Sequence, residues 1–179
     1  MDSRTNLIKF QIFSTIFAII LGTILHFTYT WSKNNSHVGL FSAVNESTWE
    51  HLKLLFFPML ISTIIGYFIF KDTFPNFLCS KTIGIIAAML FTVTFFYTYT
   101  GIIGTNYAFL NILTFILSVI IGEYVAYILI INNFTFNKIF CISILIILTV
   151  FFFIFTFYPP KINLFKDPIN SSYGIKKNS

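Results

Sequence analysis

Five long apolar segments constrain the fold of this chain more than any other feature. They cover approximately 7–29, 52–70, 82–99, 107–131 and 139–158, and each is long enough to cross a hydrocarbon layer of about 30 Å as a helix. Phe and Ile dominate them, which would favour strands in water, but in lipid a helix satisfies its own backbone hydrogen bonds. We therefore predict an all-α fold, an integral membrane bundle of about five transmembrane helices.

Composition supports a lipid environment for nearly the whole chain. Charged residues make up 9% of the sequence, whereas soluble domains carry roughly 25%. A chain this apolar cannot cover itself with a hydrated surface. We predict a single transmembrane domain over residues 1–179, with a polar outer loop at 32–51 and a C-terminal tail at 159–179.

The basic residues flank the apolar segments, where they are expected to orient the helices. They do not form a basic stripe interleaved with exposed aromatics, so membrane lipid, and not nucleic acid, is the predicted partner. One side holds Arg4, Lys9, Lys71, Lys81 and Lys138, and the opposite loops hold mainly Lys33. The positive-inside rule then places the N-terminus in the cytoplasm and the C-terminus outside.

The two cysteines are not expected to pair. Cys79 and Cys141 are far apart, show no C-x-x-C spacing and fall near the predicted cytoplasmic side, where thiols stay reduced. The sequence therefore predicts neither a disulfide nor a cysteine metal site.

Scarce polar residues gather in the segment 25–58, which contains all three histidines and both tryptophans. Ser47 and Glu50 fit a capping box at the start of the second apolar helix. Unpaired polar groups just below a membrane surface are costly, so we expect mutual pairing within one group: His26, Glu46, Glu50, His51 and Lys53.

Two interpretations of this group stay open. It is either a static hydrogen-bonded cluster that fixes helix packing or the lining of a pocket for a metal or a polar ligand. In the pocket interpretation, His26, Glu46 and His51 would be ligands of zinc or non-haem iron, Glu50 and His51 would be catalytic, and Lys53 would bind an anion. The spacing matches no known metal motif.

Four further residues are candidates for the same site or for a path from it. Asn35 and Tyr99 are placed to contribute polar contacts, and Asp167 either approaches the site or forms an Asx turn before Pro168. Glu123 lies inside the fourth apolar segment, where an ionisable side chain is by default a functional hypothesis. It is the candidate for a proton relay.

Three sequence blocks resemble those of a known family: HFTYTWSKNN at 26–35, NESTWEHLKLLFFP at 45–58 and YPPKINLFKDPINSSYGI at 158–175. The family consists of uncharacterised bacterial multi-pass membrane proteins that share a domain of unknown function. The resemblance implies a protein of the bacterial cytoplasmic membrane and supplies no activity. The residues it marks are His26, Trp31, Asn35, Asn45, Glu46, Trp49, Glu50, His51, Lys53 and Asp167.

Three functions remain open at this point. The first is a membrane module that binds or transports a small polar solute or ion at its outer face, as a possible homo-oligomer. The second is an intramembrane metal-dependent hydrolase acting on a lipid-like substrate. The third is a structural or assembly partner whose polar cluster only holds the bundle together.

Overall fold

Helix α3 (Thr48–Phe70) is the most enclosed of five long helices in the computed structural model, which describes residues 3–175. The other long helices are α1 (Ser3–Trp31), α4 (Phe77–Ile103), α5 (Ala108–Ile131) and α6 (Lys138–Phe157). Two short elements complete the described chain, α2 (Ser36–Gly39) and the 3₁₀ helix η1 (Asn163–Phe165). Every regular element of the described chain is a helix, so the all-α prediction is confirmed.

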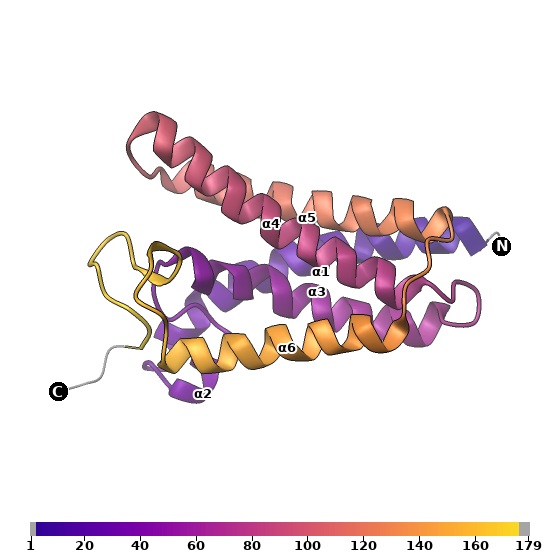
Figure 1. Cartoon of the computed structure of the whole chain (residues 1–179), viewed down its shortest axis with the longest axis horizontal. Coiled ribbons are helices and arrows are strands. Elements are labelled where there is room, and N and C mark those ends of the chain that lie inside the picture. The colour runs from indigo at the N-terminus through magenta and orange to yellow at the C-terminus, as the bar shows by residue number, and fades with distance from the viewer. Residues whose placement is uncertain (1–2, 176–179) are drawn as a thin grey trace.

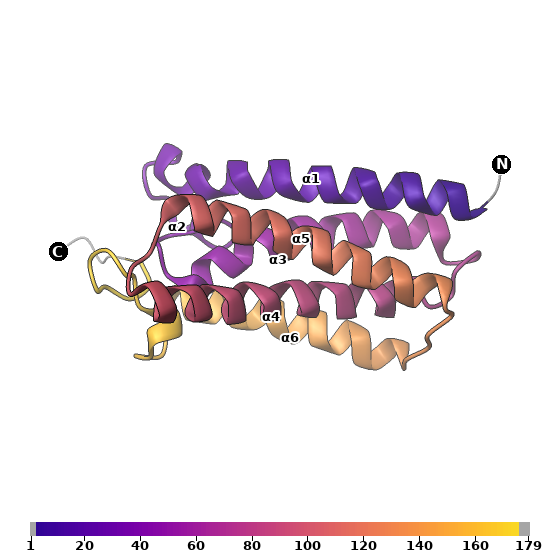
Figure 2. The same cartoon turned by 90° about the horizontal axis from the view of Figure 1, so that it is seen from above.

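The five long helices run up and down along one axis, and successive long helices point in opposite directions (Figures 1 and 2). All five are long and apolar enough to cross a membrane. Along α1, Ile12, Ile16 and Ile20 form an exposed ridge with a spacing of four residues, a surface suited to lipid. Because the number of long helices is odd, the N-terminus and the C-terminal segment lie at opposite ends of the bundle (Figure 1).

Local sequence signals explain where several helices begin and end. The Ser47 side chain accepts a hydrogen bond from the Glu50 backbone N–H at the start of α3. Asn137 caps α6 in the same way, through the N–H groups of Ile139 and Phe140. Gly104 adopts a left-handed conformation (φ 79°) and ends α4, which extends beyond the predicted 82–99 in both directions.

Aromatic packing ties the C-terminal segment to the core. The ring of Trp49 lies 4.7 Å from that of Phe152 on α6 and 4.8 Å from that of Phe165 in η1. The two tryptophans differ in exposure. Trp31 is exposed, whereas Trp49 is buried because it fills the space between α3, α6 and the tail.

The prediction that the cysteines stay unpaired is wrong, because Cys79 and Cys141 form a disulfide between α4 and α6. Both residues lie in the first turn of their helix, and these two turns are neighbours at the N-terminal end of the bundle. Their Cα atoms are 5.4 Å apart, within the usual range for a disulfide. A sequence separation of 62 residues gave no indication of this contact.

Candidate metal centre

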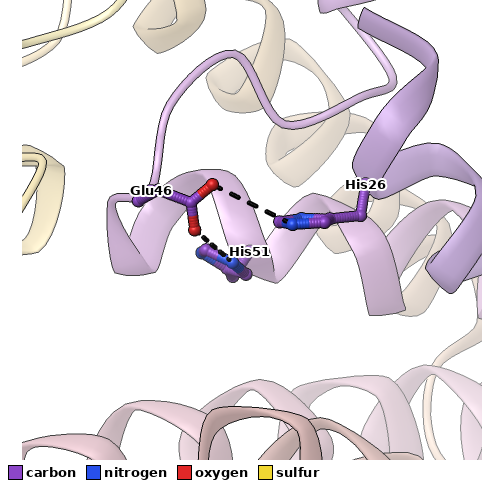
Figure 3. Close-up of side chains that lie close together, drawn as sticks. All are labelled: His26, Glu46 and His51. Carbon is purple, nitrogen blue, oxygen red and sulfur yellow. Dashed lines mark ion pairs between the residues drawn. The ribbon is translucent and has the colours of Figure 1, made fainter. Parts of the chain in front are cut away.

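Three predicted ligands, His26, Glu46 and His51, meet at the end of the bundle away from the N-terminus (Figure 3). The Glu46 carboxylate lies between the two imidazoles, with Oε1 3.9 Å from His26 Nε2 and Oε2 3.5 Å from His51 Nε2. The three ligand atoms all lie within 4.8 Å of one another. The imidazole rings are 5.4 Å apart, and 29% of each histidine side chain is exposed.

Glu46 reaches both histidines because it precedes helix α3. Helix α3 begins only at Thr48, so Glu46 does not share a helical face with Glu50 and Lys53. Ser47, the N-cap, has an extended backbone, and the Glu46 side chain before it points toward His26 on α1 (Figure 3). The polar cluster therefore divides into two groups.

Hydrogen bonds outside the three residues orient two of them. The Nδ1 atom of His51 is 3.0 Å from the Ser47 backbone oxygen, which can only accept, so Nδ1 donates to it and Nε2 faces Glu46. The Glu46 backbone N–H donates to Asp167 Oδ2 at 3.4 Å. Both contacts are of the kind that holds metal ligands in place in proteins.

Two cavities adjoin the centre. A small one of about 60 Å³ continues from Glu46 and His51 between α3, α4 and α5, where Thr92, Asn111 and Thr114 line it. A larger one of about 770 Å³ lies on the outer side of Glu46 and is closed in part by the C-terminal segment, including Asp167 and Gly174. The small cavity is large enough for a water molecule, which needs roughly 10–15 Å³ of such space.

Glu50 and Lys53 form the second group, a buried ion pair. Lys53 Nζ is 2.5 Å from Glu50 Oε2 and donates to the Gly39 carbonyl at 2.7 Å and to Thr156 Oγ1 at 3.0 Å. The Val44 backbone N–H donates to the same carboxylate at 3.0 Å. Both side chains are almost fully enclosed, so this pair joins α3 to the loop before it and to α6.

The remaining predicted residues lie around these two groups. Asn35 is exposed and caps α2 through the His37 N–H, away from the metal ligands. The Tyr99 hydroxyl donates to Asn111 Oδ1, so Tyr99 contributes to the small cavity only through Asn111.

Asp167 both forms an Asx turn and approaches the candidate site. Its Oδ1 atom accepts from the Ile169 N–H at 2.8 Å, as in an Asx turn, and its Oδ2 atom accepts from the Glu46 backbone N–H.

Glu123 lies far from this centre. Its ion-pair partner is Lys81, which was predicted to lie at the membrane surface. We expected Lys81 among the charges flanking the membrane, but it is fully buried in α4 and forms an ion pair with Glu123. Helix α4 begins at Phe77, a full turn before Lys81, so this lysine faces α5 from inside the bundle. The signal for the pair was Glu123 itself, because ionisable side chains inside membrane spans commonly pair with one another.

Comparison with known proteins gives a family and no activity. A family model described as "Family of unknown function (DUF6512)" matches residues 1–175, nearly the whole chain. The match agrees with the resemblance drawn from the three sequence blocks, which pointed to an uncharacterised family. No curated protein and no solved structure matches the chain.

Proposed function

This chain belongs to DUF6512, a family of unknown function, and we propose that it binds a divalent transition metal ion, Zn²⁺ or Fe²⁺, through His26, Glu46 and His51. The observation that carries the proposal is the position of one carboxylate between two imidazole Nε2 atoms at 3.5 and 3.9 Å. Two histidines and a carboxylate are a common ligand set for zinc and for non-haem iron.

The spacing suits an ion with small adjustments of the side chains. In a tetrahedral zinc site each ligand atom is about 2 Å from the metal, so ligand atoms lie roughly 3.3 Å apart. The two distances from Glu46 are 3.9 and 3.5 Å, and all three ligand atoms lie within 4.8 Å of one another. Closing the site around an ion therefore requires movement of the Glu46 side chain, which is 43% exposed, and of the His26 ring. The His51 ring already has its Nδ1 atom engaged and needs no reorientation.

Three protein ligands leave a coordination position for water or a solute. The small cavity next to His51, which Asn111 and Thr114 line, has room for such a ligand. The larger outer cavity connects Glu46 to the surface. This arrangement supports binding of an ion that arrives from the C-terminal end of the bundle, as a storage, sensing or uptake site would require.

The position of Glu50 favours ion binding over hydrolysis. A hydrolase needs a general base within reach of a metal-bound water. Glu50, the predicted base, is instead enclosed with Lys53 and accepts from the Val44 N–H. A purely structural role for His26, Glu46 and His51 is the remaining alternative, and it predicts no metal binding.

The proposed orientation places the metal centre outside the cytoplasm of a bacterial cell. The N-terminal end of the bundle holds Arg4, Lys9, Lys71 and Lys138 against Lys33 in the opposite loops, and this difference supports the assignment of that end to the cytoplasm. Lys161 and Lys166 in the tail and the Cys79–Cys141 disulfide at the N-terminal end favour the reverse orientation. A single cysteine at position 33 in a cysteine-free variant tests this. Labelling by a membrane-impermeant maleimide in intact cells supports it, and labelling only after lysis overturns it.

Metal analysis of the purified protein tests the function. We expect about one Zn²⁺ or Fe²⁺ per chain by elemental analysis and saturable Zn²⁺ binding to the metal-stripped protein by calorimetry. Loss of a hydrogen bond that only positions a metal ligand already lowers the metal affinity about 10–100-fold. His51→Ala and Glu46→Ala remove a ligand itself, so each should lower the Zn²⁺ affinity more than about 100-fold. His37→Ala is the matched control, since His37 is exposed on α2. Protein that binds neither ion when properly folded would overturn the proposal.

A further inference from the structure

A second polar cluster lies in the half of the bundle nearer to the N-terminus and is separate from the metal centre. Four helices contribute to it: Gln11 and Ser14 from α1, Ser62 from α3, Lys81 from α4 and Glu123 from α5. Each of these residues is at most 6% exposed. Charged side chains at this depth of a membrane bundle are costly and commonly mark proton or ion paths.

The Lys81 ammonium is surrounded by oxygen atoms. It pairs with Glu123 Oε2 and donates to Ser14 Oγ at 3.1 Å and to Gln11 Oε1 at 3.4 Å. The Gln11 amide in turn donates to the Glu123 backbone carbonyl at 3.1 Å. The ammonium therefore keeps two neutral acceptors when the carboxylate changes its charge.

Ser14 is placed to serve either protonation state of Glu123. Its hydroxyl lies 2.7 Å from Glu123 Oε1 and 2.7 Å from Ser62 Oγ, and its single proton can go to only one of them. With Glu123 ionised, Ser14 donates to the carboxylate. With Glu123 protonated, the carboxyl donates to Ser14, Ser14 donates to Ser62, and Ser62 donates to the Met59 carbonyl at 2.9 Å.

A groove of about 340 Å³ lies beside this cluster between α1 and α5. Its lining combines Gln11, Glu123 and Tyr127 with exposed apolar side chains, among them Ile8, Ile12 and Ile120. The Tyr127 hydroxyl accepts a hydrogen bond from Arg4 Nε at 3.4 Å, near the start of α1. The volume is ample for water, and both Gln11 and Glu123 contribute to its wall.

We infer that Glu123 is a proton-binding site that exchanges with the compartment at the N-terminal end of the bundle. A proton delivered by solvent through the α1–α5 groove forms an O–H bond on the Glu123 carboxylate, and the Ser14 and Ser62 hydroxyls turn without breaking a hydrogen bond. Lys81 keeps its charge and its bonds to Gln11 and Ser14. Two charged groups lie near Glu123: Lys81 from α4, and Arg4, which is hydrogen-bonded to Tyr127 at the groove. The groups that contact Glu123 from α3 and from Gln11 and Ser14 are neutral.

Infrared difference spectroscopy of the full chain in lipid vesicles tests this inference. Between alkaline and acidic pH, the wild type should gain a protonated-carboxyl band that shifts in D₂O. The band should be absent in Glu123→Gln and should move in frequency in Glu123→Asp, which preserves the carboxyl if the glutamine variant does not fold. Glu46→Gln is the control and should retain the band.

Lys81→Met separates proton binding from a fixed ion pair. Without the ammonium, a buried carboxylate loses its counter-charge, so the protonated band should be present across the whole pH range. A wild-type difference spectrum identical to that of Glu123→Gln overturns the inference, and so does a pH-dependent band that persists unchanged in Lys81→Met. Zn²⁺ binding by Glu123→Gln should equal that of the wild type, which makes failure here distinct from failure of the metal site.

Discussion

The Asp167 carboxylate accepts a hydrogen bond from the backbone N–H of Glu46 although 121 residues separate them. The same carboxylate holds its own turn through the N–H groups of Ile169 and Asn170. Asp167 is almost completely buried, so this contact is shielded from competition by water. The C-terminal segment thus fixes the loop that carries the carboxylate of the metal centre.

The first prediction concerns this contact. Asp167→Ala should weaken Zn²⁺ binding about 10–100-fold, because it removes the hydrogen bond that holds the Glu46 backbone. At other metal sites, removing a hydrogen bond that positions a ligand lowers the metal affinity by this amount. Asp167→Asn keeps only one acceptor oxygen, which the turn through Ile169 and Asn170 occupies, so this variant should also lose the Glu46 contact and bind Zn²⁺ about as weakly as Asp167→Ala. Calorimetry on the purified protein measures both. Lys166→Ala, an exposed neighbour, is the control, and an Asp167→Ala affinity equal to wild type would show that the tail does not position Glu46.

The second prediction concerns the buried pair of Glu50 and Lys53. Lys53→Met should lower the free energy of unfolding by about 3–5 kcal/mol, because it leaves the carboxylate buried without its partner. Adding Glu50→Gln to that variant removes the unpaired charge and should restore part of the loss. Denaturant unfolding in detergent provides the measurement, with exposed Lys161→Met as the control. Equal stability of the two single lysine variants would contradict the assignment.

The third prediction concerns the close contact of α4 with α5. A Cβ atom added at Gly84 would lie 2.4 Å from the Gly122 carbonyl oxygen, so the helices must separate to accept it. Gly84→Ala should therefore destabilise the protein by about 1–3 kcal/mol, as overpacking does in tight cores. Gly101→Ala lies in the same helix with no atom within 4 Å of its Cβ position. Thermal unfolding should distinguish the two, and equal midpoints would refute this packing.

The fourth prediction concerns the disulfide between Cys79 and Cys141. Protein purified without reductant should show no alkylatable thiol after denaturation, and two after reduction. Reduction should also lower the midpoint of thermal unfolding, because α4 and α6 lose their covalent connection. Cys79→Ser should already have the lower midpoint and should not respond to reductant. Two reactive thiols in the untreated, denatured protein would contradict the bond.

Sequence patterns were sufficient for the helices and for the proximity of the three residues that form the candidate metal centre. The long apolar segments allow only helices in lipid, and the few imidazoles and acids near one membrane surface had to find one another. That scarcity predicts that His26, Glu46 and His51 meet as part of one larger polar group. The division of the polar cluster did not follow, since it depends on α3 beginning after Glu46 and on Thr156 and Gly39 approaching Lys53.

Contacts between distant helices were beyond what the sequence could indicate. Lys81 lies near a helix end, so its charge was assigned to the membrane surface, and only the pairing of α4 with α5 brings it to Glu123. Cys79 and Cys141 are two small residues in different helices until α4 and α6 are placed side by side. In both cases the error has one cause: one-dimensional spacing carries no information on which helices are neighbours.

The last described residues also affect how the protein should be produced. The Gly174 carbonyl accepts from the Asn45 side chain, and the Ile175 N–H donates to the Thr156 carbonyl, so residues 174 and 175 are anchored beside the loop that presents Glu46. An affinity tag or fluorescent fusion attached there would pull on that anchor during purification. Fusions at the opposite terminus, which begins α1 at the far end of the bundle, leave the anchor intact and are the better choice for metal measurements.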